Sequence, residues 1–303
     1  MILIMGWKIV EIENARTLKL FLDNLVIETE TQKITIPLSD IDTLITHNSY
    51  LMLSSRLLVE IANHNINFII CDDKHNPSCQ LTPISGNYNS LKVFDKQLNW
   101  NYVFTGNLWK KIIIQKIMNQ AETLLHFTNN EVIYQQIIAL SKEVKDFDQT
   151  NREGHAAKLY WHYLINEDFH RTDECFLNML LNYGYAILRS MITRSIIKKG
   201  LDPRKSLYHH SFNNFFALAS DFIEVFRFCV DHLVYLIKDE YANINDAKAK
   251  LLQLMGNYKL LYNGKGLFIN NAIDDFVDHV INQSEFPTIK ILWEQSTLNQ
   301  CES

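Results

Sequence analysis

The stretch TPISGNYNS, residues 82–90, separates two parts of the chain that differ in their hydrophobic pattern. Before it, apolar and polar residues alternate, as in Lys8–Ile12 and Lys33–Leu38, and this period of two indicates β-strands. After it, apolar residues recur every three or four positions, which indicates helices. Proline, glycine and asparagine within the stretch predict a linker, so we place a domain boundary near residue 90.

We therefore expect an α+β fold, with a small N-terminal mostly-β domain at residues 1–90 and a larger all-α domain at residues 91–303. The first domain should contain one helix, from about Ser54 to His64, and a buried strand at Asn67–Cys71. In the second domain the apolar spacing predicts three long helices. They lie at about Trp109–Leu125, at Phe176–Lys199 and from about Ser220 to Asp239.

Composition excludes several classes of protein. The five cysteines form no C-x-x-C pair, so we predict neither a zinc site nor a disulfide framework, and a reducing cytoplasmic location fits. The apolar run at residues 1–5 is much shorter than the ~20 residues of a membrane span, and Met5 could serve as the initiator. A net charge of −5 argues against indiscriminate coating of nucleic acid.

Thr150–Glu153 is the first of three places in the helical part where acids or histidines could carry chemistry. Its spacing fits a capping box, in which Glu153 would bind free amides of the first turn, and this is the more frequent role. Gly154 follows directly, although glycine inside a helix costs about 1 kcal/mol relative to alanine. Something is therefore expected to lie close against this turn.

The second place is the loop pair His209 and His210, and the third is the segment from Ser220 to Arg227 with Asp221 and Glu224. Adjacent loop histidines are more often solvated than bound to a metal. Ser220 could be a helix N-cap, and the acids could form a surface ion-pair ladder with Arg227 and Asp231.

Taken together, two carboxylates and a histidine from three separate segments could bind a divalent cation. Oxygen ligands favour Mg²⁺, and an imidazole ligand shifts the preference toward Mn²⁺. Spacing alone does not bring these residues together. Six basic residues also lie between Arg189 and Lys205, against the single acid Asp202. They predict a DNA contact and a solvated helix end about equally well.

The string NREGHAAKLYW, residues 151–161, resembles the glutamate motif of the Cas-one integrases of CRISPR systems, most closely the type II-A form. The strings LNYGYAILR (181–189) and GLDP (200–203) resemble further landmarks of that family in the same order. So does His209, fifteen residues before Glu224. The strings MGWK (5–8) and FIICDDK (68–74) resemble its N-terminal domain, so the similarity covers most of the chain. Met179 departs from the family, which often has a small residue there.

The resemblance implies that Glu153, His209 and Glu224 are the catalytic metal ligands, for Mg²⁺ or Mn²⁺. His209 is preferred to His210 by its distance from Glu224, and Asp221 would orient a ligand or a water molecule. The implied enzyme is a metal-dependent integrase and endonuclease. The 3′-hydroxyl of a short DNA duplex, the prespacer, would attack a phosphodiester at the edge of a CRISPR repeat.

The same resemblance implies partners. The enzyme would form a homodimer through its β domain, and two homodimers would be bridged by a dimer of the Cas-two protein; no membrane is involved. Further type II-A adaptation proteins and the effector nuclease are conditional partners. Two alternatives stay open at this point: a metal-dependent nuclease that cuts DNA and never joins it, and a non-catalytic scaffold whose acids serve as caps and ion pairs.

Overall fold

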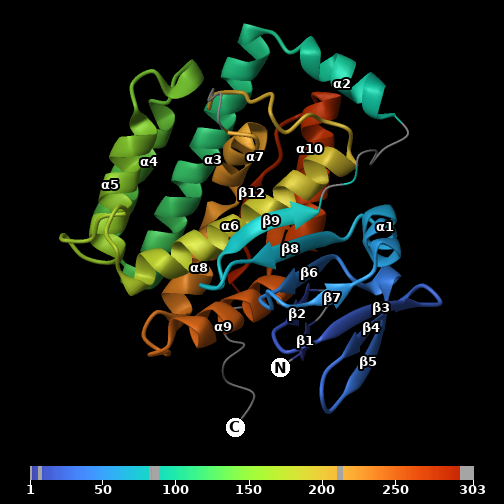
Figure 1. Cartoon of the computed structure of the whole chain (residues 1–303). Coiled ribbons are helices and arrows are strands. Elements are labelled where there is room, and N and C mark those ends of the chain that lie inside the picture. The colour runs from blue at the N-terminus through green and yellow to red at the C-terminus, as the bar shows by residue number, and fades with distance from the viewer. Residues whose placement is uncertain (1, 6–8, 82, 84–88, 210–213, 294–303) are drawn as a thin grey trace.

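The computed structural model describes residues 2–5, 9–81, 83, 89–209 and 214–293 (Figure 1). Several residues on which the predictions above depend lie outside these ranges, namely Met1 of the apolar run, Trp7 and Lys8 of the string MGWK, His210, and Cys301 among the five cysteines. Strands come first along the chain and helices dominate after them. The last strand of the first part ends at Leu81 and the next helix begins at Ser90, so the change occurs where the sequence predicts it. The division into domains 1–90 and 91–303 stays a prediction.

Two β-sheets form the N-terminal part. One has the strand order β1-β2-β6-β8-β9, and the other has the order β5-β4-β3-β7. In the first sheet β2, β6 and β8 are parallel, while β1 and β9 are antiparallel edge strands. The bounds are β1 Ile2–Met5, β2 Ile9–Ile12, β3 Thr17–Phe21, β4 Asn24–Glu28, β5 Lys33–Pro37, β6 Thr43–Thr46, β7 Met52–Leu53, β8 Asn67–Cys71 and β9 Pro77–Leu81.

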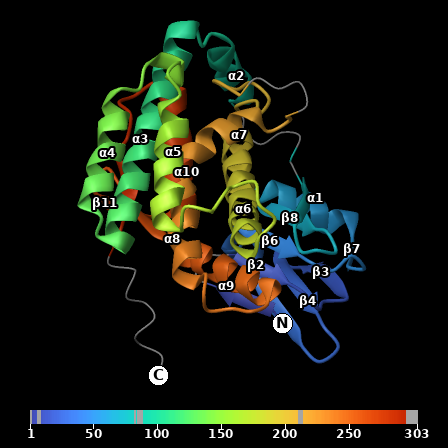
Figure 2. The same cartoon turned by 90° about the vertical axis from the view of Figure 1, so that its left-hand side faces the viewer.

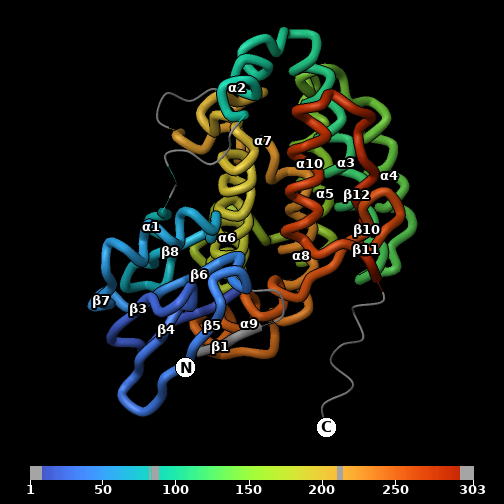
Figure 3. The backbone as a smooth tube through the Cα atoms, turned by 90° about the vertical axis from the view of Figure 1, so that its right-hand side faces the viewer, coloured from blue at the N-terminus to red at the C-terminus, as the bar shows by residue number. Residues whose placement is uncertain are grey.

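The five-stranded sheet is a middle layer with both faces covered. Because side chains alternate along a strand, Leu44 and Phe68 pack toward the second sheet and α1 (Ser55–Asn63), whereas Ile45 and Ile69 pack into the helical core. Helix α6 (Phe176–Lys198) lies along β8 and β9 (Figures 1 and 3). This double burial explains the continuous apolar run of β8. The predicted helix and the predicted buried strand of this region are confirmed.

The long helices predicted around Trp109 and after Phe176 are also confirmed. Helix α3 (Tyr102–Thr128) buries Trp109 and Ile113, and α6 is followed by Gly200 with φ +90°. Figure 2 shows α3 beside α4 (Glu131–Lys142) and α5 (Arg152–Leu164). The other helices are α2 (Ser90–Leu98), α9 (Ile244–Asn257) and α10 (Ile269–Asn282). Within the described ranges, no helix combines the length and the apolar character that crossing a membrane would require.

The prediction of one continuous helix from Ser220 to Asp239 is wrong. The chain instead forms α7 (Ala217–Phe222), the 3₁₀ turn η3 (Ile223–Val225) and α8 (Arg227–Ile237). Side chains are buried on all sides of this segment, so its apolar pattern has no one-sided period that could reveal an interruption. The tight turn carries Glu224.

The expectation of an all-α second part is wrong at one place. A three-stranded antiparallel sheet of order β11-β10-β12 is formed by β10 (Lys259–Tyr262), β11 (Lys265–Phe268) and β12 (Ile289–Ile291). Asn263 and Gly264, with φ of 48° and 77°, make the turn between β10 and β11. Asn-Gly is the commonest dipeptide of such hairpin turns, because both positions need positive φ. The architecture is therefore a β-rich N-terminal part and a mainly helical second part.

Candidate metal centre

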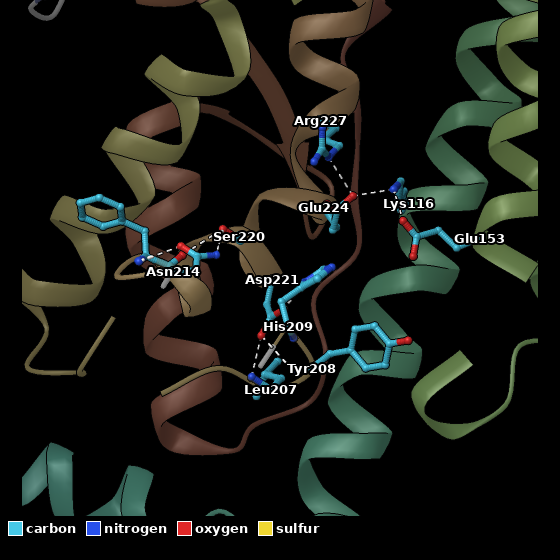
Figure 4. A network of polar contacts seen from close by, with 11 residues as sticks. Lys116, Glu153, Leu207, Tyr208, His209, Asn214, Ser220, Asp221, Glu224 and Arg227 are labelled. Atoms are coloured by element: carbon cyan, nitrogen blue, oxygen red, sulfur yellow. Dashed lines mark hydrogen bonds and ion pairs between the residues drawn. The ribbon is translucent and has the colours of Figure 1, made fainter. Parts of the chain in front are cut away.

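The two glutamates singled out in the sequence meet at one buried ammonium group (Figure 4). Glu153 lies in the first turn of α5 and Glu224 in η3, and α3 places Lys116 between them. Lys116 Nζ is 2.5 Å from Glu224 Oε2 and also donates a hydrogen bond to Glu153 Oε1. Three segments that are distant in the sequence therefore converge.

Lys116 was not among the residues that the sequence pointed to. It is only 8% exposed, which is rare for a lysine unless its charge is paired. Burial alone would lower its pKa, but the carboxylates of Glu224 and Glu153 outweigh burial and raise it. The available signal was its position: a lysine between Ile113 and Ile117, within the apolar face of a long helix.

Glu224 is held in its ionised form by two cations. Arg227 Nε donates to Glu224 Oε2 over 2.8 Å, so Lys116 and Arg227 share one oxygen. Burial would raise the pKa of this carboxyl, yet the charges of the two cations lower it to about 2. A fully ionised carboxylate therefore stands at the centre of the site at any physiological pH.

Asp221 fixes the loop that carries His209. Its carboxylate is fully buried and accepts hydrogen bonds from the backbone amides of Leu207, Tyr208 and His209 over 2.6–3.1 Å. The Nδ1 atom of His209 lies 2.7 Å from Asp221 Oδ1, and this hydrogen bond raises the pKa of His209. In Figure 4 the ring points from its loop toward Glu224, and the charges of Glu224 and Glu153 also act on it. Its other nitrogen, Nε2, is thus the one directed away from Asp221.

The capping box predicted at Thr150–Glu153 is wrong. The N-cap of α5 is Asn151, whose side chain accepts from the amide of Gly154 over 3.2 Å, and Asp148 accepts from the amides of Arg152 and Glu153. The carboxylate of Glu153 is therefore not used for capping and reaches Lys116. A Cβ atom on Gly154 would approach the Asn151 side chain to 2.6 Å, which identifies the group that lies against this turn.

The roles predicted for Ser220 and for the ion-pair ladder need correction as well. Ser220 lies inside α7, and its hydroxyl donates to the carbonyl of Phe216, so it is not an N-cap. The pair between Glu224 and Arg227 exists, but its carboxylate is buried and not on the surface. Asp231 does not join the ladder, because it accepts hydrogen bonds from Tyr160 and Tyr185.

A divalent cation fits the chemistry of this donor set, though not its present arrangement. Among the residues that the structure describes, no three His, Cys, Asp or Glu side chains are already placed to hold a metal ion. Instead, the ammonium of Lys116 joins Glu153 and Glu224. Two carboxylates with one imidazole suit Mg²⁺ or Mn²⁺, and a histidine whose second nitrogen binds a carboxylate is the usual form of a metal ligand. A cation could therefore bind if it took the place of the ammonium.

Comparison with known sequences gives two findings. The family described as CRISPR associated protein Cas1 matches residues 12–260 of this chain. A protein of Neisseria meningitidis serogroup C (strain 8013), named CRISPR-associated endonuclease Cas1, is 35% identical over 223 residues, which cover 74% of this chain and 73% of the relative. The residues matched by the family, 12–260, include Glu153, His209 and Glu224.

Solved structures resemble this fold over nearly its whole length. A casposase bound to an integration product superposes with a TM-score of 0.73 at 19% identity, covering 93% of this chain and 92% of the casposase. A chain of a Cas6-RT-Cas1–Cas2 complex superposes with a TM-score of 0.69 at 17% identity, covering 94% of this chain and 36% of the other. At these identities the likeness concerns the fold.

Proposed function

Because this chain belongs to the Cas1 family, the Cas-one integrases that its motifs resemble, we propose that it is a metal-dependent CRISPR integrase and endonuclease. In this role it inserts short DNA fragments into a CRISPR array. The observation that carries the proposal is the meeting of Glu153 and Glu224 at one buried cation, beside a histidine fixed by Asp221.

The proposed reaction exchanges one phosphodiester for another. The 3′-hydroxyl of the fragment loses its proton and forms a new P–O bond, while the P–O bond at the edge of the repeat breaks and leaves a new 3′-hydroxyl. No ATP is needed. A Mg²⁺ or Mn²⁺ ion held by Glu153, His209 and Glu224 would lower the pKa of the attacking hydroxyl and neutralise charge on the phosphate.

The other residues would maintain the geometry of these ligands. Asp221 fixes both the backbone and the ring of His209, so that Nε2 is directed away from Asp221. Arg227 holds Glu224 through its Nε atom and keeps the carboxylate ionised. Lys116 keeps the two carboxylates together in the absence of a metal. Such preorganisation reduces the reorganisation needed when DNA binds.

The partners proposed for this chain follow from its family. They are double-stranded DNA, both prespacer and repeat, and a dimeric Cas2 protein that bridges two homodimers of this chain. The β-rich part would supply the homodimer contact. Support for the Cas2 partner comes from the Cas6-RT-Cas1–Cas2 complex, one chain of which shares this fold. We also propose that the chain works in a type II-A system, in which a further adaptation protein and the effector nuclease are conditional partners.

An integration assay tests the proposal. Purified protein is incubated with its Cas2 partner, Mn²⁺, a short duplex with free 3′-hydroxyls and a supercoiled plasmid that carries the array. We expect joined product from the wild type and none from the Glu153→Ala variant. Glu143→Ala is the matched control, because Glu143 is an exposed acid near the same turn whose one ion pair in the described part of the chain is with Arg152.

The outcome also separates the alternatives. A protein that cuts branched or single-stranded DNA in this assay and never forms joined product is a nuclease, and the integrase proposal is then rejected. A protein that binds DNA but forms neither cut nor joined product, and whose binding is unaffected by Glu153→Ala and Glu224→Ala, is a scaffold. Circular dichroism of each variant shows that the loss of product does not come from unfolding.

A further inference from the structure

The basic run at residues 189–205 is mostly neutralised within the protein. Lys205 donates to the carbonyl of Leu98. Four other cations bind carboxylates: Arg194 with Asp42, Lys198 with Asp274, Lys199 with Asp278 and Arg204 with Asp202. Arg189 differs from these, since no carboxylate pairs with its guanidinium in the described part of the chain. Its pKa is lowered by burial and by the nearby charge of Arg227.

Arg189 lines a pocket of about 410 Å³ between α6 and residues 220–227. Tyr185 lies one turn before it on the same face of α6, and Ser220, Ile223 and Arg227 form the opposite wall. Arg171, Asn182 and Ala186 also line the pocket. Among the described residues that line this pocket there are three arginines and neither aspartate nor glutamate. Its electrostatic potential should therefore be positive.

Two of these guanidinium groups are held in place by one aromatic ring. The centroid of the Tyr185 ring is 4.5 Å from Arg227 Cζ and 5.5 Å from Arg171 Cζ. The ring is fixed because the Tyr185 hydroxyl donates to buried Asp231. Arg171 otherwise binds neutral side-chain oxygens of Asn178 and Asn182. These two cations are thus positioned in advance, and of the two only Arg227 has an acidic partner among the described residues, Glu224.

We propose that this arginine pocket binds a phosphate of the DNA backbone next to the phosphodiester that reacts. The inference rests on the proposed function. A planar guanidinium group can bind two phosphate oxygens at once. A pocket lined by three such groups and by no acid repels cations. Ile223 and Arg227 flank Glu224 in the chain, so a phosphate here would lie beside the proposed metal centre. Arg189 would contribute a charge that no described side chain neutralises.

DNA binding without metal tests the proposal. The affinity for a fluorescein-labelled duplex with single-stranded 3′ ends is measured by anisotropy in EDTA at several NaCl concentrations. Each phosphate contact contributes about 0.7–0.9 to the slope of log K against log salt. We expect Arg189→Gln to reduce that slope by about this amount and to weaken binding, and Arg189→Lys to retain most of the slope. Arg189 is exposed enough for these variants to fold.

Arg56→Gln is the matched control, because Arg56 is an exposed arginine on α1 in the β-rich part. It should leave slope and affinity unchanged. The proposal is overturned if Arg189→Gln behaves like this control. A second outcome also overturns it. Inorganic phosphate, at matched ionic strength, would raise the melting temperature of the wild type but not of Arg189→Gln, while both proteins bind DNA with the same slope of log K against log salt. The pocket would then hold a free ion.

Failure of this inference is distinguishable from failure of the proposed function. Binding in EDTA requires no chemistry, so the salt slopes test the pocket even if no joined product ever forms. Conversely, a wild type that integrates DNA while Arg189→Gln binds it normally keeps the function and rejects the pocket.

Discussion

Two buried carboxylates seven residues apart, Glu224 and Asp231, differ in the direction of their pKa shifts. They are 4% and 3% exposed, and burial alone raises the pKa of a carboxyl group. For Glu224 the charges of Lys116 and Arg227 overcome burial, and the pKa falls to about 2. Asp231 accepts hydrogen bonds from the hydroxyls of Tyr160 and Tyr185, and burial prevails, so its pKa rises to about 6.

The contrast shows that neighbouring charge, and not burial, decides what a buried acid can do in this protein. Glu224 stays ionised under all physiological conditions, and its partners are cations that another cation could replace. Asp231 is enclosed by tyrosine hydroxyls and orders the packing of α5, α6 and α8. Only the first arrangement is suited to binding a divalent ion.

Removing Lys116 should break this contrast with the largest effect. In Lys116→Met the buried carboxylates of Glu153 and Glu224 lose a shared cation, and we expect the free energy of unfolding without metal to fall by about 3 kcal/mol. Adding Mn²⁺ should then stabilise the variant more than the wild type, because the ion would replace the missing charge. Urea unfolding with EDTA and with Mn²⁺ measures both effects.

Lys110→Met is the control for this experiment. Lys110 lies on the same helix, and its pair with Asp146 at 3.6 Å is largely exposed, so its loss should cost less than about 1 kcal/mol. A Lys116→Met protein as stable as this control would mean that the ammonium does not hold the carboxylates. An equal response to Mn²⁺ in variant and wild type would argue that the ion binds elsewhere.

Asp221→Asn should have the next largest effect. Asparagine keeps one carbonyl oxygen for the loop amides but loses the charge that orients the His209 ring. Changes of this kind, behind a metal ligand, usually cost about 10- to 100-fold in affinity or activity, and we expect that range for the apparent affinity for Mn²⁺. Isothermal titration with Mn²⁺ measures the affinity, and the integration rate at saturating Mn²⁺ measures what remains.

Asp202→Asn is the matched control, because Asp202 lies in the same loop region and binds the exposed Arg204. Its affinity for Mn²⁺ should stay within about twofold of the wild type, as expected for a surface pair. If Asp221→Asn also stays within that range, the buried hydrogen bonds of Asp221 serve only the fold of the loop.

The sequence pointed to residues that lie together in the structure but not to how they are held; their catalytic role stays a prediction. Glu153, His209 and Glu224 were chosen through ordered motifs, and the structure brings the two glutamates to one ammonium with His209 pointing toward them. Lys116 could not be predicted, because a lysine within an apolar helix face belongs to no motif. Its role exists only through contacts with segments that are distant in the sequence.

Apolar periodicity and capping residues predicted helices reliably where one side of the helix faces solvent, and poorly where no side does. The period of α1 and the cap at Gly200 could be predicted, since each depends on a few neighbouring residues. The break at residues 223–226 could not, because the segment is buried on every side. The small sheet at the end of the chain had a local signal, Asn263-Gly264, which the period of the surrounding helices obscured.

The smallest predicted effect concerns Asp231 and the pH dependence of stability. Its pKa is raised in the folded protein from 3.8 to about 6, so its contribution to stability is complete below pH 3.8 and is lost as the pH rises through about 6. Between about pH 5 and about pH 7 that loss amounts to about 1 kcal/mol. The difference in unfolding free energy between wild type and Asp231→Asn should therefore fall by this amount over that range.

Urea unfolding at several pH values measures this difference. Asp239→Asn, at the exposed end of the same segment, is the control and should give a difference that does not vary with pH. A flat difference for Asp231→Asn as well would mean that this carboxyl titrates in the folded protein as it does in the unfolded chain. Burial would then not measurably raise the pKa of Asp231. The argument that the cations around Glu224 overcome a rise in pKa caused by burial would lose its basis.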